Sequence, residues 1–410
     1  MDTDAALAET VRIEGTRILA TLIRTVGSLP VAEDAVQEAA LRALRDWPRT
    51  GVPEEPRAWL TVTARRVAID LLRREGARAQ KERASVELTV PDLPPDSVVA
   101  DDRLRLIFTC CHPALALEAQ VTLALRTLCG LSPAQIAAVL LTSEAAVAKR
   151  LTRTRKKIAT AAIPYRAPAD EELPARLAAV CAVLHTSYTI AHTAAGGDRL
   201  TDVDGTREAL RLARLVHELM PDEPSPMAVL ALVLLTESRR AARLDGAGLP
   251  IPLSEQDRSL WNTDAIAEAS GLLNDSLRRT GAVADPYQLQ AAIAAEHARA
   301  TSYRCTDWAE IVRLYDLLMS VRPSAPVALA RAVALAERDG PAVGLKALED
   351  LEPDQRWHAV RGELLSREER FAEAVQATRA SLSESVTDPE RRYRQRRIAD
   401  WSAQTEEEVT

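Results

Sequence analysis

The chain has 410 residues, 47% of them hydrophobic, which is enough for roughly two to three domains with ordinary cores. Aromatic residues make up only 3%, and no long alternation of apolar and polar residues occurs, so a β-rich fold is excluded and an all-α fold is expected. The net charge of −7 hides an asymmetry, because residues 1–160 sum to +3 and the remainder to −10. The acidic total therefore does not exclude nucleic-acid binding by the first part, since local charge governs such binding.

Cysteine usage and the absence of long apolar runs indicate in which cellular compartment the protein is found. The five cysteines are odd in number and show no CxxC spacing, which favours a reducing environment. Asp2, Asp4 and Glu9 stand where a secretory signal would need basic residues. The longest apolar run, residues 227–235, is too short to cross a bilayer. We expect a cytoplasmic protein without a membrane anchor.

The first strong helix is predicted over residues 31–47, between Pro30 and Pro48. Near its start, Asp34, Gln37 and Glu38 form an acidic, amide-bearing patch. This patch either suits the helix dipole or forms a surface for a partner, and periodicity alone does not decide between the two.

A second long helix is predicted from Arg57 to about Glu75, with Leu60, Ala64, Val67 and Leu71 on its inner side. Residues 57–83 hold eight cations and three anions. The acidic, proline-containing segment that follows is typical of a flexible linker.

Three adjacent residues, Cys110, Cys111 and His112, suggest a metal site, but neighbours in sequence do not easily ligate one ion. We expect the cysteines to pack as small apolar residues and His112 to form a turn before the next helix. No cofactor or metal is expected.

Residues 131–158, LSPAQIAAVLLTSEAAVAKRLTRTRKKI, predict a helix-turn-helix. Ser132, Pro133 and Gln135 give the first helix a cap, a first-turn proline and a capping-box partner. The second helix carries six cations and no anion from 149 to 157. Such a face either is solvated or contacts DNA phosphates, and the motif favours DNA.

The motifs AEDAVQEAALRAL (32–44), RAWLTVTARRVAIDLLRR (57–74) and residues 131–158 together resemble an extracytoplasmic-function sigma factor of the sigma-70 family. The resemblance implies region 2 at residues 1–84, a linker at 85–101 and a region 4 helix-turn-helix at 102–163. It implies binding to the beta-prime clamp helices of core RNA polymerase and to promoter DNA, and no catalytic activity. The residues that it assigns to polymerase are Asp34, Gln37 and Glu38; to the −10 element, Arg65, Arg66, Arg73, Arg74 and Arg78; and to the −35 element, Ser143, Glu144, Lys149, Arg150 and Arg153. Arg66 stands where many members have asparagine.

Residues 168–410 are acidic, and ten helices are predicted between 171 and 383, forming a helical solenoid. From about residue 286 they resemble degenerate tetratricopeptide (TPR) repeats, with consensus-like spacing at Trp308, Ile311, Tyr315, Leu318 and Pro323 and again at Trp357, Leu364, Phe371 and Ala374. The extension also resembles that of a sigma-factor subgroup, through LSEQDRSLWN (253–262) and GAVADPYQLQAAIAAEHARA (281–300). AHTA at 191–194 replaces that subgroup's Phe-Asn-Glu-Gly stretch.

The extension offers one candidate polar site, with the residues Asp257, Arg258, Trp261, Glu296 and His297. They form either a pocket for a ligand or regulator, or a buried polar network that fixes helix ends. We interpret the chain as a sigma factor regulated through this extension by a protein or a small molecule. The alternatives are a stand-alone helix-turn-helix regulator with a TPR-like sensor domain, or an enzyme centred on Asp257, Glu296 and His297.

Overall fold

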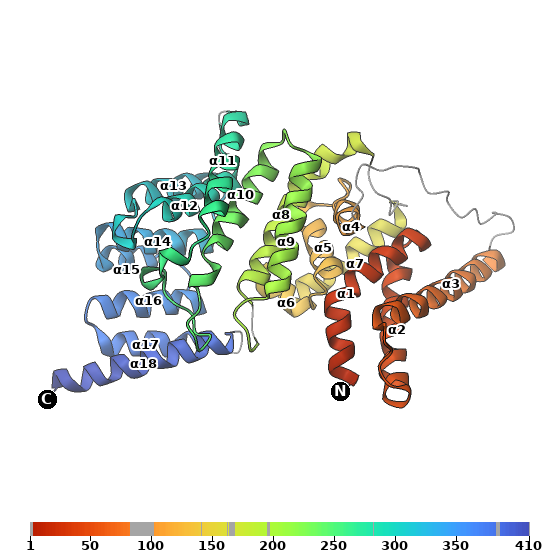
Figure 1. Ribbon diagram of the computed structural model, residues 1–410, viewed down its shortest axis with the longest axis horizontal. Coiled ribbons are helices and arrows are strands. Elements are labelled where there is room, and N and C mark those ends of the chain that lie inside the picture. Colours follow the sequence, from red (N-terminus) through yellow and green to blue (C-terminus); the bar gives the residue numbers. More distant parts are fainter. Residues whose placement is uncertain are drawn as a thin grey trace. The chain divides into compact units, whose positions relative to one another are not determined.

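The computed structural model describes residues 3–82, 102–140, 142–161, 163, 169–194, 197–281, 283–382 and 386–409. Within these residues the chain is all-α, apart from one isolated bridge between Leu244 and Pro250. Contacts divide it into two compact units, residues 1–183 (unit 1) and 184–410 (unit 2), which Figure 1 colours from red to yellow-green and from green to blue. The expected linker at 85–101 lies outside the described residues.

Unit 1 begins with three mutually packed helices, α1 (Thr3–Val26), α2 (Leu29–Thr50) and α3 (Pro56–Glu82), drawn in red and orange in Figure 1. Alanines at 32, 35, 39 and 43 form the inner face of α2, where small side chains allow close approach of its neighbours. At its end the rings of Trp47 and Trp59 meet edge to face at 5.7 Å.

Both helix boundaries predicted in this region need correction. Helix α2 continues through Pro48 and stops at Gly51, whose φ of 81° ends the helix. Proline is tolerated there because it removes only one hydrogen bond, in the last turn. Helix α3 extends to Glu82, beyond the predicted end near Glu75.

Four more helices complete the core of unit 1: α4 (Asp102–Cys110), α5 (Leu117–Leu128), α6 (Pro133–Val139) and α7 (Glu144–Thr160). The predicted capping box is confirmed, because the Gln135 backbone N–H donates to Ser132 Oγ at 3.2 Å and the Ser132 N–H donates to Gln135 Oε1 at 2.8 Å. Gly130, with φ of 64°, allows the sharp turn after α5. Helices α5, α6 and α7 pack on one another around Ile136 and Val147, both fully buried.

Helix α8 (Leu173–His192) begins in unit 1 and ends in unit 2. Its first half is anchored in unit 1 by Arg176, which is 4% exposed and donates to the Phe108 carbonyl at 2.8 Å. Burying this cation is tolerable because Glu172 Oε2 accepts from its other nitrogen at 3.1 Å.

All ten helices predicted over 171–383 are present, and in unit 2 each from α9 onward packs against the next. After α8 they are α9 (Val203–Leu219), α10 (Pro224–Ser238), α11 (Thr263–Arg279), α12 (Pro286–Arg299), α13 (Trp308–Val321), α14 (Ala325–Asp339), α15 (Pro341–Leu348), α16 (Gln355–Arg367) and α17 (Phe371–Ala380). Helix α10 is shorter than predicted, because a 3₁₀ turn at Arg240–Ala242 follows Ser238. A further helix, α18 (Asp388–Val409), packs on α17 through Trp401.

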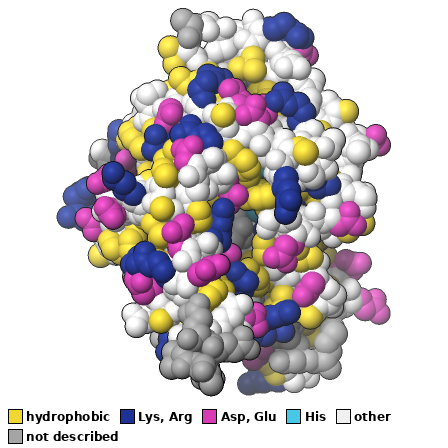
Figure 2. Space-filling model, turned by 90° about the vertical axis from the view of Figure 1, so that its left-hand side faces the viewer, with side chains coloured by type: hydrophobic (Ala, Val, Ile, Leu, Met, Phe, Trp, Pro, Cys, Tyr) yellow, Lys and Arg dark blue, Asp and Glu magenta, His cyan; other side chains and the backbone are white. Residues whose placement is uncertain are grey.

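The sequential packing of unit 2 gives a series of small cores. One core joins Leu289, Ile311 and Leu318, with Trp308 and Tyr315 packed against it. Another joins Ala336 and Leu364. Helices α16 and α17 touch closely at Gly362, where a Cβ would lie 2.2 Å from Thr378 Oγ1. The face of unit 2 seen in Figure 2 carries basic and acidic side chains interspersed, so neither sign forms a continuous patch on it.

Candidate functional site

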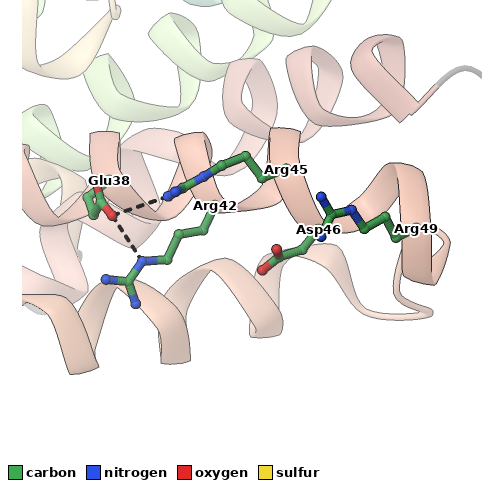
Figure 3. Close-up of a pocket in the computed structure, with 5 residues that line it drawn as sticks. All are labelled: Glu38, Arg42, Arg45, Asp46 and Arg49. Carbon is green, nitrogen blue, oxygen red and sulfur yellow. Dashed lines mark hydrogen bonds and ion pairs between the residues drawn. The ribbon is translucent and has the colours of Figure 1, made fainter.

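The outer face of α2 presents the first set of predicted site residues. Asp34 and Gln37 are exposed. Glu38 is more enclosed, because its Oε1 accepts from Arg42 Nε at 3.0 Å and from Arg45 Nη2 at 3.5 Å. An open pocket on this face is lined by Glu38, Arg42, Arg45, Asp46 and Arg49 (Figure 3). The predicted acidic patch is therefore partly neutralised by arginines on the same helix.

Two apolar residues on this face were not predicted as site residues. Leu41 is 53% exposed and Leu44 is 45% exposed, and they continue the line of Asp34 and Gln37 along α2 at helical spacing. Their position opposite the buried alanines is the signal that identifies them. Exposed leucines beside charged groups suit the centre of a protein-protein contact.

The arginines predicted on α3 lie on its exposed side. Arg65, Arg66, Arg73 and Arg74 are exposed, and no hydrogen bond or ion pair holds any of them among the described residues. Two apolar side chains of α3 are also exposed: Val62, at 50%, precedes these arginines, and Ile69, at 38%, lies between the two pairs. The backbone of Arg78 belongs to α3, but its side chain lies outside the described residues. This face combines free cations with apolar surface, as single-stranded nucleic acid requires.

The start of α7 has the geometry of a capped recognition helix. Ser143 Oγ accepts from the Ala146 backbone N–H at 3.2 Å, so Ser143 is the cap, and Glu144 occupies the first turn. Lys149 and Arg153 are exposed and make no ion pair among the described residues. Their side chains are available to an external anion.

The remaining cations of α7 do not all face solvent. Arg150 fixes α7 to α5, because its guanidinium donates to Glu118 Oε2 at 3.0 Å and to Thr122 Oγ1 at 3.2 Å. Lys157 Nζ donates to the Ala114 carbonyl. Not all six cations of α7 are therefore free to bind DNA, because Arg150 and Lys157 also make contacts within the fold.

Arg155 makes the longest-range of these contacts. Its Nη2 donates to Glu33 Oε2 at 2.8 Å, and Thr127 Oγ1 lies 3.4 Å from the other carboxylate oxygen. Burial raises the pKa of Glu33, while the charge of Arg155 acts in the opposite direction. This ion pair joins α7 to α2, which lie in the two different sequence motifs of unit 1.

The cysteine-histidine sequence after α4 is structural. Cys110 and Cys111 are fully buried, and burial raises the pKa of both thiols. His112 Nδ1 accepts from the Ala114 N–H at 3.2 Å, which closes the predicted turn. Among the described residues no three His, Cys, Asp or Glu side chains are grouped so that they could hold a metal ion.

The polar site predicted in unit 2 is only partly assembled. The guanidinium carbon of Arg258 lies 4.6 Å from the centre of the Trp261 ring, and Arg258 Nη1 donates to the His297 carbonyl. Asp257 is exposed and its carboxylate caps a 3₁₀ turn by accepting from the Ser259 N–H. Glu296 pairs with Arg299 on its own helix. The structure thus joins Arg258, Trp261 and His297, and no hydrogen bond or ion pair connects the two acids to these three among the described residues.

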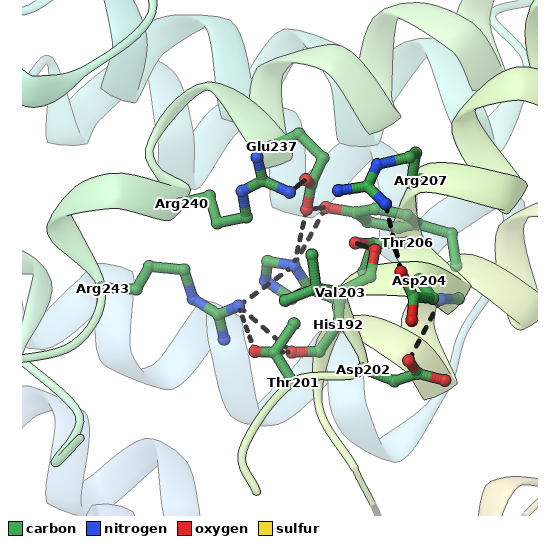
Figure 4. Close-up of polar contacts among 12 residues, drawn as sticks. His192, Thr201, Asp202, Val203, Asp204, Thr206, Arg207, Glu237, Arg240 and Arg243 are labelled. Atoms are coloured by element: carbon green, nitrogen blue, oxygen red, sulfur yellow. Dashed lines mark hydrogen bonds and ion pairs between the residues drawn. The ribbon is translucent and has the colours of Figure 1, made fainter. Parts of the chain in front are cut away.

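A buried polar network at the end of α8 was missed by sequence reasoning (Figure 4). Tyr188 donates to Glu237 Oε1 at 3.0 Å and lies 2.9 Å from His192 Nδ1. Arg243 donates to the His192 carbonyl at 3.1 Å and to Thr201 Oγ1 at 3.2 Å. His192 belongs to the AHTA stretch, and the hydrogen bond from Arg243 to its carbonyl fixes the backbone where α8 ends.

Comparison with known protein families matches the chain in three places. Sigma-70 region 2 matches residues 11–78, and Sigma-70 region 4 matches residues 105–158. The chain therefore carries both of these sigma-70 regions. Its region 2 comprises most of α1 to α3 and its region 4 comprises α4 to α7, so the exposed arginines of α3 and the capped helix α7 lie within the two matched regions. A family of unknown function, DUF6596, matches residues 176–277 of the chain.

Relatives of the chain fall into two groups. An uncharacterized protein of Rhizobium meliloti (strain 1021) is 40% identical over 92% of this chain and 91% of its own length. Two proteins of Mycobacterium tuberculosis, named probable ECF RNA polymerase sigma factor SigI and ECF RNA polymerase sigma factor SigJ, are each 32% identical, over 33% and 43% of this chain. The matched parts span 48% of SigI and 59% of SigJ.

No solved structure matches the chain. Among the described residues, no helix has the length and apolar character of a membrane span.

Proposed function

We propose that the chain is a sigma factor that binds core RNA polymerase and directs it to specific promoters in the cytoplasm, with unit 2 controlling its activity. The observation that carries the proposal is the presence, within one unit, of a helix with exposed leucines beside polar groups (α2) and of two further helices (α3 and α7) with exposed cations that are unpaired among the described residues. Helices α2 and α3 lie in the matched region 2, and α7 lies in the matched region 4.

Polymerase contact is assigned to the outer face of α2. Polar groups are supplied by Asp34, Gln37 and Glu38. Apolar surface that would be buried on binding is supplied by Leu41 and Leu44. Each leucine buried in an interface contributes on the order of 1 kcal/mol. The partner surface that we propose is the pair of clamp helices on the beta-prime subunit.

DNA contact is assigned to α3 and α7. The exposed arginines of α3 would hold the −10 element as a single strand, together with Arg78, and Val62 and Ile69 would contact its bases. At α7, Ser143, Glu144, Lys149 and Arg153 would reach the −35 duplex in the major groove. Arg150 would act chiefly through positioning, because its guanidinium is already bound to Glu118.

The polymerase surface is tested with Leu41→Ser plus Leu44→Ser. The matched control is Leu277→Ser on α11, since Leu277 is 42% exposed in unit 2. Binding of purified full-length protein to core polymerase is measured by surface plasmon resonance. We expect the double variant to bind at least ten-fold more weakly and the control to bind normally. Equal binding by all three proteins would refute the assignment of this face.

The DNA surface is tested with Lys149→Ala, Arg153→Ala and the control Lys346→Ala, an exposed lysine in unit 2. The affinity of the protein-polymerase complex for promoter DNA is measured at several salt concentrations. Each lost phosphate contact should reduce the slope of log K against log salt by about one unit. Tight duplex binding by the protein without polymerase would instead favour a stand-alone helix-turn-helix regulator.

Control by unit 2 is tested by truncation. A chain ending at residue 192 keeps α8 whole, including Arg176 and its bond to Phe108. Its transcription activity is compared with that of the full chain. A loss of activity would make unit 2 a required part, a gain would make it inhibitory, and no change would refute a regulatory role.

We further propose that the helices of unit 2 form degenerate TPR-like repeats. Each helix from α9 onward packs on the next, and Trp308 and Tyr315 pack against one of the cores of this unit.

A further inference from the structure

A basic cluster in unit 2 lies where the end of α10 meets the segment before α11. The Asn262 N–H donates to the Ser238 carbonyl at 2.8 Å, which brings the chain at Arg239 beside Trp261. Arg258 lies over the Trp261 ring and donates from Nη1 to the Ala300 carbonyl at 2.8 Å. The structure therefore places the Arg258 guanidinium against the indole ring, the backbone of Arg239 beside Trp261, and both arginines close enough to His297 for their charges to act on it.

The positive charge of this cluster is not balanced. No carboxylate forms an ion pair with Arg239 or Arg258 among the described residues, and the side chain of Arg239 makes no hydrogen bond there either. The pKa of Arg239 is lowered mainly by burial, and the charge of Arg258 acts in the same direction. Burial, helped by these two arginines, lowers the pKa of His297 to about 4, so His297 is neutral near pH 7. Two cations are thus held close together with no counter-ion.

Several donors in the cluster also lack acceptors. Arg258 Nη2 and Trp261 Nε1 are buried with no hydrogen-bond partner, and the whole Trp261 side chain is only 6% exposed. His297 Nδ1 is buried without a partner as well. A buried donor left unbonded costs about 1 to 3 kcal/mol, so folded proteins usually pair such groups. The nearest acid in sequence, Asp257, is occupied by its own backbone turn.

The chemistry that satisfies unpaired guanidinium and indole N–H groups is that of an oxyanion. Guanidinium groups bind the oxygens of phosphate and carboxylate through two parallel hydrogen bonds. Arg239 and Arg258 are both partly exposed, so an anion has access to the cluster from solvent. We propose that Arg239, Arg258 and Trp261 form a binding site for a small oxyanion, a phosphate or carboxylate group carried by a metabolite. This site goes beyond the proposed transcription function and gives unit 2 a ligand to respond to.

The test measures thermal unfolding of the full-length protein in buffer free of such anions, to which inorganic phosphate or succinate is added. Sodium chloride at matched ionic strength controls for screening. The wild-type melting temperature should rise with one of the two anions at millimolar concentration and not with chloride, because a ligand that binds only the folded state stabilises it. The anion that acts identifies the ligand group as phosphate or carboxylate.

Two variants localise the effect. Arg239→Gln should abolish the rise, and Arg258→Lys, which keeps the charge but loses the planar fork, should weaken anion binding at least ten-fold. Arg392→Gln, an exposed arginine on α18 in the same unit, should respond as wild type does. Since Arg239 has no partner to lose, Arg239→Gln should melt at or above the wild-type temperature when no anion is present. No rise in the wild type, or an equal rise in Arg239→Gln, would overturn the proposal.

Discussion

The ion pair between Arg155 and Glu33 provides a quantitative test of how unit 1 holds its two sigma-70 regions together. The Glu33 side chain is 13% exposed and Arg155 is 39% exposed, with 2.8 Å between Nη2 and Oε2. A hydrogen bond to a charged group contributes about 1.5 to 3 kcal/mol to stability. Solvent around Arg155 screens the ion pair, so its contribution should lie near the lower end of this range. Arg155→Ala also leaves a buried carboxylate with only Thr127 as a partner. We expect it to lower the free energy of unfolding by about 1 to 2 kcal/mol.

The assay is a double-mutant cycle of urea unfolding at pH 7 with Arg155→Ala, Glu33→Gln and both together. Glu33→Gln should cost less than Arg155→Ala, because burial already disfavours the charged form of Glu33 and raises its pKa. Lys156→Ala, an exposed neighbour, should change stability by less than about 0.5 kcal/mol. A coupling energy indistinguishable from zero, or an Arg155→Ala variant as stable as Lys156→Ala, would refute this reasoning.

Three further predictions concern local features. Ser132→Ala removes the side chain that caps α6 and should lower stability by about 1 kcal/mol in the same urea assay, whereas Thr160→Ala at the exposed end of α7 should not. Gly362→Ala places a Cβ 2.2 Å from Thr378 Oγ1 and should lower the unfolding free energy of unit 2 by about 1 to 3 kcal/mol. The control is Gly271→Ala: Gly271 is exposed, a Cβ there would meet no other atom, and the unfolding free energy should not fall. Burial, with a smaller effect of Arg322, lowers the pKa of His185 to about 4. The unfolded chain therefore binds a proton more readily, and stability should fall by about 1 to 2 kcal/mol between pH 7 and pH 5. In His185→Gln, calorimetry at both pH values should find a smaller fall, and an unchanged fall would assign the pH dependence to other groups.

Helical periodicity and capping chemistry predicted most of the fold. The cap at Ser132 was correct because it depends on residues close in sequence. The end of α2 was wrong because the penalty for proline depends on its place in the helix, and Pro48 lies in the last turn. Helix α18 is strongly polar and depends on the burial of Trp401, which is a tertiary effect.

The sequence predicted on which helices the candidate residues of unit 1 lie, but not which of them pair with one another. Sequence spacing placed Arg150 and Arg153 together on α7, yet only the fold shows that Arg150 is held by Glu118, more than thirty residues away. The exposure of Leu41 and Leu44 likewise follows from which side of α2 packs against α1 and α3. In unit 2, the meeting of Arg258 and His297 was anticipated, whereas the participation of Arg239 required the backbone bond between Asn262 and Ser238.

The most direct test of the central claim is transcription reconstituted from purified core RNA polymerase, the full-length protein and a library of genomic fragments. We predict discrete transcripts with common upstream sequences, absent with core polymerase alone and with the variant carrying Leu41→Ser and Leu44→Ser. Transcription no different from that of core polymerase alone, with no stable complex between the protein and core, would contradict the account.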